Sequence, residues 1–189
     1  MLRFNSNILL NIAAILLVAM FFSCGNKMKE VKDFLADKNL PIGEVTNVYL
    51  VHTDSGRIKT KLISPLMLDF SNRKEHPYSK FPNGIKIVTY DEKKDSVILT
   101  ADYLISFNKT SISEVKGNVV VVNEADGSKL ITDQLFWDAN EHYIYTEKKF
   151  TLIANLDTIK GIGFESNEDL SKVNMKSIYD SQIYVKENP

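Results

Sequence analysis

Few side chains in this sequence have the type and spacing that chemistry requires. The histidines are His52, His76 and His142, and none has a second histidine or a cysteine at the spacing of metal ligands. Asp102 and Asp133 end the corresponding segments Leu-Thr-Ala-Asp and Leu-Ile-Thr-Asp, and a carboxylate pair could perform acid–base catalysis. Because the aspartates recur within a repeated strand pattern, we expect them to be structural. The histidines are expected to pack between strands or lie at the surface.

Motifs of the common enzyme classes are absent from the sequence. There is no Gly-x-Ser-x-Gly, no phosphate-binding glycine loop and no His-Glu-x-x-His. Gly161 and Gly163 are too few for a dinucleotide fingerprint, and they lie in a predicted strand. The formal net charge is −1, which gives no electrostatic case for nucleic acid. The sequence predicts no catalytic residue, no metal site, no cofactor and no enzyme.

Cys24, the single cysteine, follows an N-terminal apolar run. Arg3 precedes the run, which covers residues 8–22, and Ser23 separates it from the cysteine. This order is typical of a secretory signal, and a cysteine after a small residue makes it similar to a lipoprotein signal. We therefore expect residues 1–23 to be removed and Cys24 to carry a lipid anchor that holds the chain on a membrane.

The alternative is a retained transmembrane helix, but residues 8–22 would rise only about 22 Å, whereas a hydrocarbon core is about 30 Å thick. Either way, the rest of the chain lies outside the cytoplasm. Residues 25–29 lack an acidic cluster of the kind that resembles a surface-export signal of lipoproteins. Its absence favours retention at the periplasmic face of the inner membrane. Residues 24–43 form a polar spacer, in which Val31, Phe34 and Leu35 permit one short helix.

Strand-like alternation of apolar and polar residues begins near Glu44, so residues 44–189 are predicted to form one β domain. Val45–His52 and Arg57–Ile63 flank a turn at Gly56, which predicts a hairpin, and Pro65 should end its second strand or lie at an edge. The other predicted strands are Ile85–Tyr90, Val97–Phe107, Val119–Asn123, Lys129–Trp137, His142–Glu147, Phe150–Ala154, Thr158–Phe164 and Gln182–Lys186.

A weak repeat of about 30 residues relates the strand pairs that open at Leu99, Leu130 and Ile159. A strand pair cannot bury its apolar face alone, so the units should stack into an elongated sheet folded over an apolar interior. Each end strand of such a stack has one unpaired edge. The repeat places the following residues on the inner face: Ile85, Ile87, Leu99, Val119, Val121, Leu130, Phe150, Leu152, Ile159 and Phe164.

Six motifs follow one another along these strands: Phe81-Pro-Asn-Gly-Ile-Lys-Ile-Val-Thr-Tyr-Asp-Glu, Leu99-Thr-Ala-Asp-Tyr, Lys116-Gly-Asn-Val-Val-Val-Val-Asn, Lys129-Leu-Ile-Thr-Asp-Gln-Leu-Phe-Trp-Asp138, Ile144-Tyr-Thr-Glu and Gly161-Ile-Gly-Phe-Glu-Ser-Asn-Glu-Asp-Leu170. Their order and spacing, over roughly residues 44–186, resemble the LptC family, the periplasmic component of the lipopolysaccharide export system, in its Bacteroidetes-type lipoprotein form. The resemblance implies a β-jellyroll related to the bridging protein LptA. Well-studied members carry a transmembrane helix where this chain has Cys24.

The resemblance also implies a relay function. The domain would receive lipopolysaccharide from an inner-membrane ABC transporter, hold the lipid A acyl chains against its inner face and pass them to an LptA-like bridge protein. By family position, the edge facing the transporter would contain Val48 and Leu50, and the edge facing the next jellyroll would contain Ile183 and Val185. The alternatives are a lipoprotein scaffold that binds protein strands without lipid, and a tethered hydrolase using Asp102 and Asp133.

Overall fold

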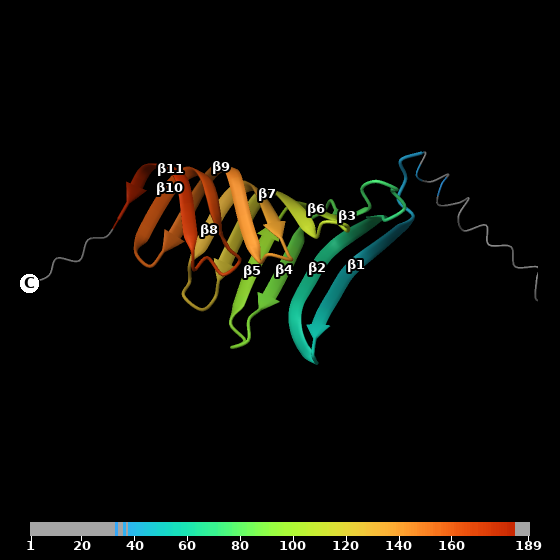
Figure 1. The fold of residues 1–189 in the computed structure, drawn as a ribbon, viewed down its shortest axis with the longest axis horizontal. Coiled ribbons are helices and arrows are strands. Elements are labelled where there is room, and N and C mark those ends of the chain that lie inside the picture. Colours follow the sequence, from blue (N-terminus) through green and yellow to red (C-terminus); the bar gives the residue numbers. More distant parts are fainter. Residues whose placement is uncertain (1–32, 34–35, 37, 184–189) are drawn as a thin grey trace, which may run out of the picture.

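The computed structural model describes Asp33, Ala36 and residues 38–183, and eleven strands between Gly43 and Gln182 form one antiparallel sheet. The all-β prediction is confirmed. The strands follow one another along a single long axis, with β1 and β11 at opposite ends (Figure 1). Their bounds are β1 (Gly43–Asp54), β2 (Arg57–Phe70), β3 (Tyr78–Phe81), β4 (Ile85–Tyr90), β5 (Ser96–Ala101), β6 (Tyr103–Phe107), β7 (Ile112–Asn123), β8 (Lys129–Asp138), β9 (Tyr143–Ala154), β10 (Asp157–Asn167) and β11 (Val173–Gln182).

The N-terminal features predicted from the sequence lie outside the described residues. These are the signal segment 1–23, the anchor Cys24 and the short helix expected around Val31, Phe34 and Leu35. Within the described part of the chain, no helix has the length and apolar character needed to cross a bilayer.

The sheet is folded in two along a line of irregularities that crosses the strands one after another, which we call the crease. Asn47, Gly117, Asn118 and Gly163 adopt positive φ on this line, and the register shifts beside them in β7 and β10. Each bulge bends its strand. The crease divides the strands into half-sheet A, with residues 119–123, 129–132, 150–154 and 157–162 of β7–β10, and half-sheet B, with residues 112–116, 134–138, 143–146 and 164–167.

Half-sheet A continues through β5, β4 and the first part of β2 to β1, while half-sheet B continues through β6 and β3 to the end of β2. Pro65 lies where β2 changes partner from β4 to β3, and it therefore interrupts neither ladder although it lacks an N–H. The prediction that the strand might end at Pro65 is wrong, because this gap accommodates the proline.

Asp102 also lies on the crease, between β5 and β6, and its carboxylate accepts a hydrogen bond of 2.7 Å from Asn118 Nδ2. Its backbone N–H donates to the carbonyl of Gly117. Asp133 occupies the matching position in β8, at the register shift between β8 and β9. The repeated aspartates thus mark where each strand bends, as expected for a structural role.

The inner faces of the two half-sheets pack against each other and form a single apolar core. Half-sheet A contributes Val119 and Leu130, and half-sheet B contributes Val115, Leu135 and Phe164, all of them fully buried. Burying a large aliphatic or aromatic side chain stabilises a fold by about 1.5–3 kcal/mol relative to leaving it exposed. The fold therefore depends on contact between the halves as well as on the strand ladders.

Several strand boundaries differ from those predicted. The segment 97–107 is two strands, because the crease breaks it at Asp102, whereas residues 143–154 form one strand bent at a bulge. The short strand β3 was not predicted. Among the described residues the C-terminal edge strand is β11, which ends at Gln182, and residues 184–186 of the expected strand Gln182–Lys186 lie outside the described residues.

Gly161 of β10 shows how closely the inner face is packed. A Cβ atom there would clash with the carbonyl oxygen of Ser177 and lie 2.5 Å from the Phe150 ring. We expect Gly161→Ala to lower the free energy of unfolding by about 1–3 kcal/mol, the usual cost of overpacking. Urea denaturation followed by circular dichroism measures this loss. The control is Gly43→Ala, whose Cβ would meet its nearest neighbour at 3.7 Å, an ordinary contact. An equal loss in both variants would contradict the packing argument.

Candidate functional site

The inner face of half-sheet A carries an unbroken row of apolar side chains, which we call the inner row. Each member is the direct cross-strand neighbour of the next, across eight strands from β1 to β10. With strands about 4.8 Å apart, the row extends over about 34 Å. It consists of Leu50, Leu62, Ile87, Leu99, Val121, Leu130, Leu152 and Ile159.

The ten side chains assigned to the inner face from the repeat all lie in or against this core. Nine are buried, and Ile159 is partly buried and packs against the others. Ile85, Val119 and Phe150 lie beside the inner row, and Phe164 approaches from half-sheet B with its ring centroid 5.2 Å from that of Phe150. The structure brings these residues together into one apolar interior that runs through the domain.

Where β4, β5 and β7 face β8 and β9, the interior is nearly closed. The cavity between the half-sheets, lined by Ile87, Leu99, Val121 and Ile144 among others, has a volume of about 20 Å³. That is room for about one water molecule and far too little for an acyl chain. A chain could therefore enter only if the half-sheets separate.

A much larger cleft lies between the free margins of the two half-sheets, opposite the crease. Its volume is about 820 Å³, and its walls are the turns and strand ends of both halves. At the β11 end the margins meet, because Asn123 Nδ2 donates to the carbonyl of Asp169 at 2.8 Å and Leu170 is buried in the core. The cleft is rich in carboxylates, with one lysine, Lys59, beside Asp54, Asp91, Glu92, Asp95, Glu168 and Asp169.

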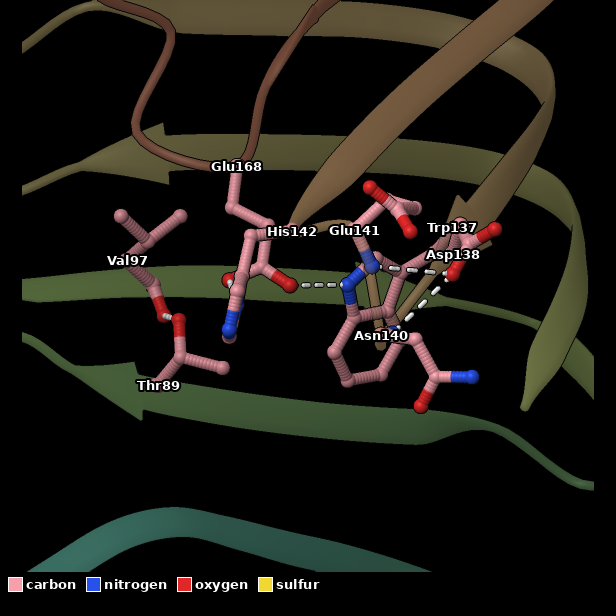
Figure 2. Close-up of polar contacts among 8 residues, drawn as sticks. All are labelled: Thr89, Val97, Trp137, Asp138, Asn140, Glu141, His142 and Glu168. Atoms are coloured by element: carbon pink, nitrogen blue, oxygen red, sulfur yellow. Dashed lines mark hydrogen bonds and ion pairs between the residues drawn. The ribbon is translucent and has the colours of Figure 1, made fainter.

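Trp137, His142 and Glu168 meet where this cleft reaches the interior, beside Thr89 and Val97 (Figure 2). The Trp137 indole N–H donates to Glu168 Oε1, and His142 Nδ1 lies 3.3 Å from Glu168 Oε2. The sequence predicted a packing or surface role for His142 and singled out neither Trp137 nor Glu168 as a site residue. No local signal could have paired them, since 31 residues separate the tryptophan from the glutamate.

The two end strands, β1 and β11, each have one edge without a partner strand among the described residues. Of the residues predicted at these edges, Leu50 is 49% exposed, whereas Val48 is buried on the inner face. Ile183 is exposed just after β11, and Val185 lies outside the described residues. Both ends present apolar side chains to solvent, including Val45, Tyr49 and Val51 on β1 and Ile178 and Tyr179 on β11.

Ion pairs gather on the outer face near β11. A hydrogen bond from Tyr143 and a second from Asn174 lower the pKa of the Glu165 carboxyl, and a hydrogen bond to Glu147 raises the pKa of Lys176. Lys176 and Glu147 are exposed and Glu165 is partly exposed, and surface pairs of this kind contribute little to stability. Protonation or deprotonation of this outer-face network should therefore have little effect on the stability of the domain.

No group of three or more potential metal ligands occurs within the described part of the chain. His52 and His142 line the cleft, and His76 lies in an exposed loop. What the arrangement can do chemically is bury apolar groups between two half-sheets while polar groups stay in the cleft.

Comparison with known proteins agrees with this architecture. A family model described as "LptC: Lipopolysaccharide-assembly, LptC-related" matches residues 12–182. No curated protein sequence matches the chain. Because the family match covers most of its length, the chain belongs to the LptC family, which acts in lipopolysaccharide transport in the periplasm at the inner membrane and is not a family of enzymes.

Proposed function

We propose that this protein takes lipopolysaccharide from the inner-membrane ABC transporter and passes it to an LptA-like bridge protein. The acyl chains would lie between the half-sheets, along the inner row. The observation that carries this proposal is the row itself, because it extends from β1 at one end of the domain to β10, beside the last strand, without a polar side chain.

A continuous apolar row is needed because exposing an acyl chain to water costs a large free energy. An acyl chain in water costs about 0.8 kcal/mol per methylene, so a chain of about twelve carbons would cost on the order of 10 kcal/mol to expose. Contact with the inner row would remove this cost while the sugars remain in the solvated cleft. The nearly closed interior requires the half-sheets to part as a chain enters and to close behind it.

The free edges of β1 and β11 would join the domain to its neighbours. Addition of a partner strand to an open edge supplies backbone hydrogen bonds and makes one sheet continuous with the next. The β1 edge, with Leu50 at the start of the inner row, would face the transporter, and the β11 end, with Ile183 and Val185, would face the bridge protein. A lipid on Cys24 would keep residues 44–189 at the donor membrane, with residues 24–43 as the spacer.

Photo-crosslinking in cells tests the route of the lipid. A crosslinker placed at Leu62 or Ile159, both partly buried members of the inner row, should capture lipopolysaccharide. The matched controls are Lys61 and Lys160, the neighbouring outward-facing positions on the same strands, where capture should be absent. Equal capture at all four positions would contradict the proposal. Capture of partner proteins at the strand edges, with no lipid at Leu62 or Ile159, would support the scaffold alternative instead.

A further inference from the structure

Trp137 lies between the apolar cavity and the solvated, polar cleft. It lines the apolar cavity together with Leu99 and Val121, and it also lines the solvated cleft together with Asp91 and Asp169. Its ring packs against the core. An indole suits such a position, because it combines a large apolar body with one polar N–H.

Glu168 fixes the indole in this position. One carboxylate oxygen accepts from the indole N–H, and the other lies 3.3 Å from His142 Nδ1. The backbone N–H of Glu168 also donates to the carbonyl of His142 at 3.1 Å, so the turn that carries the glutamate is held against the start of β9. The N–H end of the ring is thereby directed toward the cleft.

The opposite wall of the same passage comes from half-sheet A. Thr89 of β4 and Val97 of β5 border both spaces, and they lie beside the Trp137 and Glu168 pair (Figure 2). A ligand lying partly in the interior and partly in the cleft would have to pass between these two walls.

We propose that Trp137 marks the boundary between the acyl chains and the sugar head group of the bound glycolipid, with Glu168 as its positioning residue. This inference rests on the proposed function and adds the residues that set the boundary within the ligand. The head group would lie in the cleft, whose walls carry six carboxylates against one lysine. Carboxylates accept hydrogen bonds from hydroxyl groups, so the cleft can bind the hydroxyl groups of a sugar at this boundary.

The chain contains one tryptophan, so its intrinsic fluorescence reports on this position alone. The test uses the full chain in nanodiscs of unlabelled lipid, with dodecyl maltosides added below their micelle concentration. Bromine, a short-range quencher, is placed either on the carbons beside the sugar or at the end of the acyl chain. We expect bromine beside the sugar to remove most of the emission and bromine at the chain end to leave most of it.

Variants of the turn separate positioning from charge. Glu168→Ala should abolish the difference between the two bromine positions, and Glu168→Gln, which keeps an acceptor for the indole, should restore it. Asp169→Asn removes a carboxylate from the same turn without touching the indole and should behave like the parent protein. Loss of the difference in Asp169→Asn as well would show that charge, not positioning, is responsible.

Equal quenching by both maltosides in the parent protein would overturn the inference, and so would failure of the maltosides to bind. Neither result would decide the proposed function, which is judged by lipid capture at Leu62 and Ile159. A protein that captures lipopolysaccharide there but shows equal quenching would retain the relay function and lose the assigned boundary.

Discussion

Replacing Leu50 with aspartate should block lipopolysaccharide transport while leaving the domain folded. Leu50 begins the inner row and is 49% exposed, so a carboxylate at this position stays hydrated in the empty protein. An acyl chain arriving there would have to displace that water, and burying an unpaired carboxylate costs several kcal/mol. In cells depleted of the parent protein, we expect the Leu50→Asp variant to let lipopolysaccharide accumulate in the inner membrane.

The matched control is Tyr49→Asp, on the same edge strand and 60% exposed. Because successive side chains of a strand point to opposite faces, Tyr49 lies outside the inner row while disturbing the β1 edge to a similar degree. We expect this variant to support transport. Equal failure of both variants would show that the strand edge, and not the row, is what the substitution damages.

The largest effect on stability should come from Phe164→Ala. Phe164 is fully buried between the half-sheets, against Phe150 from β9. Removing a buried phenylalanine leaves a cavity and costs about 3–5 kcal/mol. Since a whole domain is stable by only about 5–15 kcal/mol, the urea midpoint should fall sharply.

Phe136→Ala provides the comparison. Phe136 is half-buried on the outer face of β8 and stacks on Tyr145 with ring centroids 5.0 Å apart. An aromatic pair of this kind contributes about 0.5–1.5 kcal/mol beyond its buried area. A loss in Phe136→Ala as large as that in Phe164→Ala would mean that contact between the halves is not the main source of stability.

The inner face could be predicted from the sequence because strands alternate strictly. Leu99, Leu130 and Ile159 occupy equivalent places in the repeat, and Val121 and Leu152 of the partner strands lie between them as direct cross-strand neighbours. The same argument places a residue such as Phe150 in the interior. Alternation alone does not separate a closed core from an open groove, and the structure shows an interior that is nearly closed.

The crease could not be predicted, because a bulge reverses the alternation without any fixed sequence signature. In β8 the buried residues are Leu130 and Thr132 on one side of Asp133 and Leu135 on the other, so the inner face changes from even to odd numbers. The prediction kept Lys129–Trp137 as one strand but divided β9 into His142–Glu147 and Phe150–Ala154, and in neither case did it place a bend. The pairing of Trp137 with Glu168 is hidden for a different reason, since only the folding of the sheet brings their turns together.

In mechanical terms, the crease acts as a hinge, so the domain deforms most easily by a change in the angle between the two half-sheets. Asn47, Gly117 and Gly163 already adopt positive φ there, so bending at the crease would leave the strand ladders within each half-sheet intact. The free-energy cost of opening is then mostly the loss of apolar contact between the half-sheets, together with the loss of the hydrogen bond from Asn123 to the carbonyl of Asp169. An acyl chain restores the contact that opening removes, whereas water does not. We therefore expect the half-sheets to separate further as more acyl chain enters and to stay together when no lipid is bound. The closed state protects the apolar interior from unwanted partners.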